Sequence, residues 1–280
     1  MTQSAPKTPR VSVIIPTYNR RDALARALQS VLDQTHTPAE VIVVDDGSTD
    51  DTRSFVTELG EQHSSVLYVY QHQQGAAAAR NNGLRRATGD LIAFQDSDDA
   101  WATTFLERLL PHVAGRPRTV AFSSHRTHHR NGHSVVVPER HVPDPARLIP
   151  RTNVISTQTV LADRSIFDEG AAFDPHLRRF QDWDLWLTML ASHRVTFVHV
   201  PELLVDLYRM DDSISEGSPR VRDACLRAIA RKHVRLFLRR PRALARIALR
   251  GYLRPTLQRA TAGLWARTRD ISGPEAREAK

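Results

Sequence analysis

The chain has 280 residues, of which 41% are hydrophobic and 25% are charged. This composition is ordinary for a globular protein and argues against wholesale disorder. The length suffices for one large domain, or for one medium domain with an appendage. A single cysteine, Cys225, excludes an intrachain disulfide and a cysteine-rich metal site, and it fits a reducing compartment.

Charge is distributed unevenly along the chain. From Arg220 to the C-terminus there are 17 Lys and Arg against 4 Asp and Glu, whereas residues 1–219 carry 22 against 27. A mildly acidic body is therefore followed by a strongly basic tail. Such a tail favours an anionic partner such as a membrane surface, or it packs on the body with its arginines in water. No recognition motif for nucleic acid accompanies the charge, so we expect no nucleic-acid partner.

The beginning of the chain bears on localisation. The first ten residues are polar, and the apolar run that follows them is too short for the core of a signal peptide. No stretch approaches the roughly 20 apolar residues of a spanning helix. We therefore expect a cytoplasmic protein, either free or associated with a membrane through its basic tail.

Apolar runs alternate with segments of helical periodicity from residue 11 onward. Continuous apolar runs predict buried strands, and apolar residues spaced by three and four predict helices. The expected strands cover residues 11–16, 39–48, 66–71 and 90–99. The expected helices cover residues 21–34, 50–60 and 75–87. This alternation predicts an α/β fold with a mostly parallel sheet flanked by helices.

The remainder of the chain is less regular. We expect loops with one or two strands over residues 115–150, a further strand within 154–167 and a short helix over 181–190. From residue 216 the pattern predicts basic amphipathic helix, interrupted at Pro241, Gly251 and Pro255. The chain is thus expected to divide into three parts, at 1–9, 10–215 and 216–280.

Polar residues follow three of the predicted strands directly. They are Pro16-Thr17-Tyr18, Asp45-Asp46-Gly47-Ser48 and Asp96-Ser97-Asp98-Asp99. In open sheets of this kind, ligands bind beyond the carboxyl ends of the strands. The sequence therefore predicts a binding site at that edge of the sheet.

The acidic segment after the fourth strand has the chemistry of a metal site. Asp96, Asp98 and Asp99 fall within four residues, and adjacent carboxylates repel one another unless a cation lies among them. Oxygen ligands suit Mg²⁺ or Mn²⁺, which keep coordination positions for phosphate oxygens. The alternative is a solvated acidic turn that caps a helix starting near Trp101.

Four motifs occur together in a fixed order along the chain. They read VSVIIPTYNR, VIVVDDGSTD, GAAAARNNG and FQDSDD. This set resembles the family 2 glycosyltransferases of the GT-A fold over residues 10–215. The resemblance implies an inverting transfer of sugar from a nucleotide-diphosphate sugar, usually UDP-linked, to a hydroxyl acceptor. It also implies dependence on Mn²⁺ or Mg²⁺, and a role in glycan, polysaccharide or glycolipid synthesis with a glycan or lipid-linked acceptor.

The resemblance assigns roles on the nucleobase side of the donor. Pro16, Thr17 and Tyr18 would border the base, with Tyr18 close to the base or ribose. Asp46 would accept a hydrogen bond from the base. Alternatively, Tyr18 is a wedge against the sheet.

Further residues would serve the phosphates and the sugar. Arg80 would approach the base or diphosphate through planar, charge-assisted hydrogen bonds, unless it is a solvated helix residue. Asp96 and Ser97 would face the ribose or donor sugar, and Asp98, together with Asp99, would hold the metal.

The segment FQDWDLWLTML at residues 180–190 resembles the family's Glu-Asp stretch, with Gln181 at the first position. Asp182 would deprotonate the acceptor hydroxyl, and it can also serve as a helix N-cap. Asp184 is expected to face elsewhere on the helix.

Two segments depart from the family pattern. Ala171 or Ala172 stands where glycine is usual, and Asp211 and Asp212 follow Tyr-Arg where a histidine is usual. The contribution of that histidine to metal or diphosphate binding is therefore in question.

Four histidines, His125, His128, His129 and His133, are expected to be exposed in a loop near the acceptor rather than to form a transition-metal site.

Two other functions compete with sugar transfer. A nucleotidyltransferase also uses a metal beside an acidic strand end, but it usually has a glycine-rich basic phosphate loop, which PTYNR does not provide. A sugar-nucleotide-binding module without turnover is the non-enzymatic alternative. The presence of both Asp98 and Asp182 argues against that module.

Overall fold

The computed structural model describes residues 8–192, 194–209 and 218–248. The chain divides into two compact units, Met1–Glu216 and Gly217–Lys280. Each unit is described by itself.

The first unit alternates strands and helices over most of its length. Its strands are β1 Val11–Thr17, β2 Glu40–Asp45, β3 Val66–Tyr70, β4 Leu91–Phe94, β5 Ala100–Trp101, β6 Thr119–His128, β7 Ser134–Val137, β8 Val160–Asp163 and β9 Thr196–Tyr208. Its helices are α1 Arg21–Leu32, α2 Thr52–Gln62, α3 Ala76–Leu84, α4 Phe105–Val113, α5 Pro145–Leu148, α6 Ser165–Asp168 and α7 Gln181–Ser192, with a 3₁₀ turn, η1, at Thr157–Thr159.

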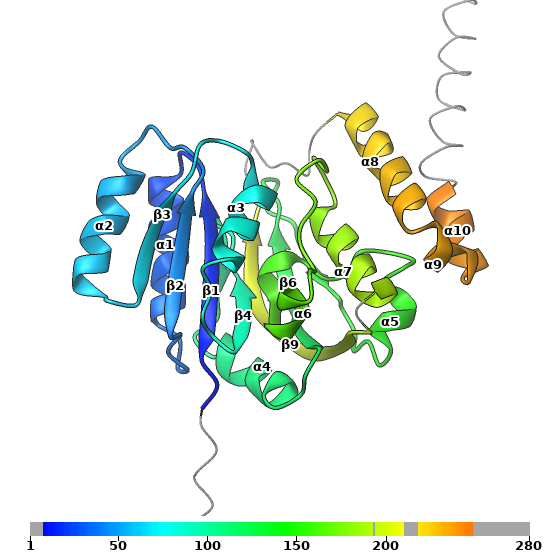
Figure 1. Cartoon of the computed structure of the whole chain (residues 1–280), viewed down its shortest axis with the longest axis horizontal. Helices are drawn as coiled ribbons and strands as arrows, with labels where there is room; N and C mark the ends of the chain where they lie inside the picture. Colours follow the sequence, from blue (N-terminus) through cyan, green and yellow to red (C-terminus); the bar gives the residue numbers. More distant parts are fainter. Residues whose placement is uncertain (1–7, 193, 210–217, 249–280) are drawn as a thin grey trace, which may run out of the picture. The chain divides into compact units, whose positions relative to one another are not determined.

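The strands form one mixed sheet in the order β3-β2-β1-β4-β8-β6-β9-β5, with β7 paired to β6 (Figure 1). Strands β1 to β4 are parallel, as predicted, and each pairs in register with its neighbour. The second half is mixed, because β8 runs antiparallel to both β4 and β6 while β6 and β9 are parallel. Strand order reverses between β1 and β4, which is where open α/β sheets bind ligands.

Some elements differ from the sequence prediction. Strand β4 ends at Phe94, so the acidic residues that follow lie in a loop. Trp101 belongs to β5, and the helix expected to start near it, α4, begins at Phe105. The thirteen-residue strand β9 was not expected, because its polar and apolar residues do not form the continuous run that marked β1 and β2.

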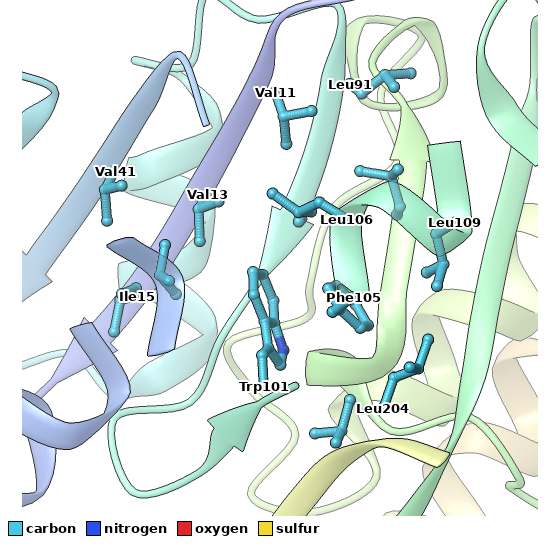
Figure 2. Close-up of a cluster of buried hydrophobic side chains, with 14 of the residues drawn as sticks. Val11, Val13, Ile15, Val41, Leu91, Trp101, Phe105, Leu106, Leu109 and Leu204 are labelled. Carbon is cyan, nitrogen blue, oxygen red and sulfur yellow. The ribbon is translucent and has the colours of Figure 1, made fainter. Parts of the chain in front are cut away.

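A large hydrophobic core cluster lies on one face of the sheet (Figure 2). Strand β1 contributes Val11, Val13 and Ile15 at alternate positions, as expected for side chains that share one face of a strand. Helix α4 packs against β6, β8 and β9 and adds Phe105, Leu106 and Leu109 to the same cluster. The ring of Phe105 stacks on Trp101 at a centroid distance of 4.2 Å. Burial of each large apolar side chain contributes about 1.5–3 kcal/mol to folding.

Helix α3 packs on the opposite face, close to β1. Gly83 is buried there, and a Cβ at this position would lie 2.5 Å from Cγ2 of Ile14. The absence of a side chain therefore allows α3 to approach the sheet closely. Ala79, on the same helix, packs with Ile42 and Val44 of β2. This approach fixes the position of α3 and of the polar residues that it carries.

The second unit contains three described helices. They are α8 Pro219–Lys232, α9 Val234–Leu238 and α10 Pro241–Ala248. Helix α10 begins at Pro241, as the predicted interruption requires, whereas Gly251 and Pro255 lie outside the described residues. In the part of the chain that the structure describes, no helix combines the length and apolarity needed to cross a membrane.

Replacement of Gly83 by alanine tests the close approach of α3. In an ordinary helix the change would stabilise the protein by about 0.5–1 kcal/mol. Here we expect it to lower the free energy of unfolding by about 1–3 kcal/mol, because the new methyl group clashes with Ile14. Urea denaturation measures the difference, and a more stable variant would contradict the packing argument.

Candidate active site

Three loops meet at the carboxyl edge of the sheet, where β1, β2 and β4 end. The backbone N–H of Asp46 donates to the carbonyl of Thr17, and that of Gln95 donates to the carbonyl of Ile14. The segments that follow β2 and β4 are thereby tied to either side of β1. The predicted convergence of the three polar segments is present.

The loop after β1 is joined to the loop after β2 by side chains. The N–H of Asn19 donates to Oγ of Ser48, and Oδ1 of Asn19 accepts from the N–H of Thr49. Thr17 is buried, whereas Tyr18 has 40% of its surface exposed. Tyr18 is therefore not a wedge buried against the sheet, and its ring is available to a ligand.

Asp46 organises the loop that leads into α3. Its Oδ1 accepts from Nε2 of Gln71 and from the N–H of Gln74, both within 2.8 Å, and its Oδ2 accepts from the N–H of Gly75 at 2.7 Å. Gly75 has a φ of +91°, which favours glycine over other residues. In this structure the carboxylate of Asp46 accepts hydrogen bonds from the loop before α3. Its predicted contact with a nucleobase stays a prediction.

Two arginines, one directly before α1 and one on α3, form ion pairs with the acidic segment. Nη2 of Arg80, on α3, lies 2.5 Å from Oδ1 of Asp96, and Nη1 of Arg20 lies 2.9 Å from Oδ2 of Asp98. Arg80 is buried, so it is not a solvated helix residue. The two cations offset part of the negative charge that the acidic segment concentrates.

Asp99 is held differently from its neighbours. Its Oδ2 accepts from Nε2 of Gln158 at 2.5 Å, and its Oδ1 accepts from the N–H of Tyr208 at 2.9 Å. Burial, followed by the charges of Asp96 and Asp98, raises the pKa of Asp99 well above its usual range. Asp99 thus joins the acidic segment to the second half of the sheet.

The donor chemistry of this segment fits a hard divalent cation. Carboxylate oxygens are the ligands that Mn²⁺ and Mg²⁺ prefer, and crowded carboxylates gain from an added cation. Within residues 8–192, 194–209 and 218–248, no three His, Cys, Asp or Glu side chains are grouped as a metal site. A cation would therefore take few protein ligands and would complete its coordination with phosphate and water oxygens, as Mg²⁺ commonly does.

Asp182 is the second residue of α7, and the residue directly before the helix, Phe180, is strained. Phe180 has a φ of +61°, in the left-handed region that non-glycine residues seldom adopt. Oδ1 of Asp182 accepts from the N–H of Trp183, and Oδ2 accepts from Nδ2 of Asn153, both at 2.7 Å. Burial raises the pKa of Asp182 despite these hydrogen bonds and the nearby charge of Arg80.

Asp184 and Gln181, on the same helix as Asp182, have structural roles. Asp184 is fully buried, in agreement with the expectation that it faces away from Asp182. Nε2 of Gln181 donates to the carbonyl of Leu177 at 2.7 Å. A glutamate carboxylate could not make that bond, so the amide has a defined function where the family usually has glutamate.

One cavity of about 530 Å³ is lined by residues from both halves of this unit. Of the predicted site residues, its lining includes Pro16, Arg80, Asp96, Ser97, Asp98, Asp99 and Asp182. Thr17, Tyr18 and Asp46 are not part of the lining.

Several lining residues were not anticipated from the sequence. They are Arg20, Asn153, Gln158, Arg178, Arg179, Tyr208 and Arg209. Arg20 ends the motif VSVIIPTYNR, so its position gave a signal. Tyr208 and Arg209 are the Tyr-Arg that precedes Asp211, and Arg178 and Arg179 follow Ala171 and Ala172 in a segment also compared with the family pattern. Asn153 and Gln158 come from segments without such a pattern, and the fold brings them to the cavity.

The prediction of exposed loop histidines was wrong for His125. This residue lies in β6, is 5% exposed and lines the cavity. Burial, followed by the charge of Arg209, lowers the pKa of His125 to about 4, so the ring is neutral near pH 7. His128 also lies in β6, where it stacks on Tyr208 and contacts Asp206 at 2.7 Å. Asp211 and Asp212 lie outside the described residues.

Comparison with known proteins identifies the family. Residues 12–169 match the model of glycosyl transferase family 2. The putative teichuronic acid biosynthesis glycosyltransferase TuaG of Bacillus subtilis is 35% identical over 214 residues, which cover 75% of this chain and 82% of TuaG. WfgD of Escherichia coli, a UDP-Glc:alpha-D-GlcNAc-diphosphoundecaprenol beta-1,3-glucosyltransferase, is 29% identical over 205 residues, covering 72% of this chain and 78% of WfgD. Some relatives are longer, and the match spans 32% of one glycosyltransferase of Nostoc.

Solved structures share the fold. Staphylococcus aureus TarS 1–349 in complex with UDP-GlcNAc superposes with a TM-score of 0.63 at 21% identity, over 87% of this chain and 72% of TarS 1–349. The mannosyltransferase PcManGT of Pyrobaculum calidifontis, in complex with GDP-Man and Mn²⁺, has a TM-score of 0.64 at 22% identity, over 96% of this chain and 77% of PcManGT. The chain belongs to glycosyl transferase family 2, and the predicted GT-A fold is confirmed.

Proposed function

We propose that the protein is an inverting glycosyltransferase that uses a UDP-linked sugar donor and a hydroxyl-bearing glycan or lipid-linked acceptor. One observation carries the proposal: the arginine-paired acidic segment Asp96–Asp99 and the carboxylate of Asp182 line the same cavity. Two separate acidic centres in one cavity suit a reaction that needs both stabilisation of a leaving group and a base.

Asp182 is the proposed general base. Its carboxylate accepts the proton of the acceptor hydroxyl as that oxygen attacks the anomeric carbon of the donor sugar. The bond from this carbon to the diphosphate breaks as the new glycosidic bond forms. Attack from the face opposite the diphosphate inverts the configuration at the carbon.

Residues around the acidic segment are proposed to hold the leaving group. Departure of a nucleoside diphosphate develops negative charge, and preorganised cations in a water-poor site stabilise that charge. Arg80 supplies a guanidinium that is already fixed by Asp96. A Mn²⁺ or Mg²⁺ ion would be held by Asp98, with Asp99 as a further candidate ligand, and its chemistry is to offset charge on both phosphates.

The assignment of UDP and of the acceptor rests on relatives. WfgD is named for UDP-Glc and a diphosphoundecaprenol-linked acceptor, TuaG for teichuronic acid biosynthesis, and TarS binds UDP-GlcNAc. PcManGT instead binds GDP-Man, so a GDP-sugar is the competing donor. Polysaccharide or glycolipid synthesis is the process that these relatives favour.

The second unit is proposed to attach the enzyme to an anionic membrane surface from the cytoplasmic side. In the described part of this unit, exposed cations alternate with exposed apolar side chains. The cations include Arg231, Lys232, Arg235 and Arg239, and the apolar residues are Val234 and Leu238. Basic residues beside apolar ones are typical of segments that bind at the surface of anionic bilayers.

Donor binding should require a divalent cation and Asp98. Calorimetric titration of a UDP-sugar into wild type and Asp98→Asn, with and without Mn²⁺, tests this expectation. We expect measurable affinity only for wild type with Mn²⁺, because the amide binds a cation more weakly than a carboxylate does. Asp22→Asn, at a side chain that is 94% exposed, serves as the matched control. Equal affinity in all four conditions would refute the metal assignment.

Asp182→Asn should fold and bind the donor with nearly unchanged affinity, while transfer falls by at least about a hundredfold, within the usual range for loss of a general base. In wild type, transfer should decline as the pH falls through the raised pKa of Asp182, because the protonated carboxyl cannot accept the proton. Asp184→Asn, at a fully buried position, should lower stability instead. Loss of donor binding in Asp182→Asn would move this residue to the donor site.

A chain that ends at residue 216 should remain folded and bind nucleotide, because residues 1–216 form a compact unit. Its binding to vesicles containing phosphatidylglycerol should fall at least about tenfold with loss of the basic tail, while neutral vesicles give the baseline for both proteins. Co-sedimentation measures the change. Equal vesicle binding, or unfolding of the shortened chain, would contradict the membrane role.

A further inference from the structure

The segment between α5 and η1 is fastened to α7 by two buried indoles. Nε1 of Trp183 donates to the carbonyl of Ile149 at 2.7 Å, and Nε1 of Trp186 donates to the carbonyl of Ile155 at 3.0 Å. These bonds flank Asn153 on both sides along the chain. The backbone that carries Asn153 is therefore fixed relative to the helix that carries Asp182.

Within the described part of the chain, the side chain of Asn153 makes one hydrogen bond, and that bond is to Asp182. Nδ2 donates to Oδ2 of the carboxylate at 2.7 Å. A carboxylate at this position only accepts, so the nitrogen end of the amide faces it. Oδ1 of Asn153 is buried and has no hydrogen-bond partner among the residues that the structure describes. Asn153 also lines the cavity beside Asp182, so its amide meets the carboxylate at the wall of the candidate site.

The geometry points to Asn153 as the positioning residue of the catalytic base. We infer that its amide, together with the N–H of Trp183, fixes the rotation of the Asp182 carboxylate and leaves lone pairs directed to the cavity for the acceptor's proton. This inference rests on the proposed role of Asp182 as base.

Asn153 also favours the ionised form of Asp182. Burial and the charge of Asp96, beyond β4, raise the pKa of Asp182, whereas Asn153, the N–H of Trp183 and Arg80 of α3 lower it. Removal of the Asn153 amide should therefore raise the pKa of Asp182 further. The base would then be protonated over a wider acidic range, and the acidic limb of the pH–rate profile would move to higher pH.

Asn153→Leu keeps the approximate size of the side chain and removes its hydrogen bond. In the full chain, labelled with ¹³C at aspartate carboxyls, the pKa of Asp182 should rise by about one to two units, as expected for loss of a hydrogen bond to a charged group. The acidic limb of transfer should shift by the same amount, while the Kd for UDP changes by less than about twofold. Asn153→Asp, which places a second carboxylate there, should raise the pKa at least as far. If one variant does not fold, the other provides the test.

Thr152→Ala is the matched control, since the neighbouring residue does not line the cavity. It should leave both the titration of Asp182 and the pH–rate profile unchanged. An unchanged titration of Asp182 in Asn153→Leu would overturn the inference. Full transfer activity in Asp182→Asn would instead refute the proposed base, and the carboxyl titration would still show whether Asn153 acts on Asp182.

Discussion

The ion pair between Arg80 and Asp96 joins the two elements on which the cavity depends. Arg80 is buried on α3, and its guanidinium contacts the carboxylate that follows β4 at 2.5 Å. Removal of Asp96 would leave the charge of the buried Arg80 without this partner, which is destabilising, whereas the Asp96 carboxylate itself is partly exposed. The close approach of α3 to β1 at Gly83 and the anchoring of its first residues by Asp46 place Arg80 where this pair can form.

The second half of the sheet completes the cavity through longer-range contacts. Asp99 receives hydrogen bonds from Gln158 and from the backbone of Tyr208, which lies at the end of β9. These bonds tie the acidic segment to strands that follow it by many residues. The two indoles of α7 similarly hold the segment of Asn153 beside Asp182. The cavity is therefore bounded by fixed elements on both sides.

Departures from the family pattern are accommodated locally where the structure describes them. Gln181 replaces the usual glutamate, and its amide closes the turn before α7 by donating to the carbonyl of Leu177. Phe180, directly before α7, has a left-handed backbone conformation and lines the cavity.

The sequence alone determined the first half of the fold and the polar residues at its edge. Continuous apolar runs marked β1, β2 and β3, and the motifs that follow them identified Asp96, Asp98 and Asp182 through a family resemblance. Local pattern suffices for β1 and β2 because parallel strands buried on both faces are nearly continuously apolar. The edge strand β3 has an apolar run as well, although Leu67 and Tyr70 are exposed.

Tertiary structure alone decided which other side chains reach the cavity. His125 was expected in an exposed loop, but it lies in β6 between β7 and β9, where it pairs with Val137 and Val205. Asn153 belongs to no periodic segment, and only the indole hydrogen bonds bring it to Asp182. Such contacts join residues far apart in the chain, so their geometry depends on packing that no local pattern records.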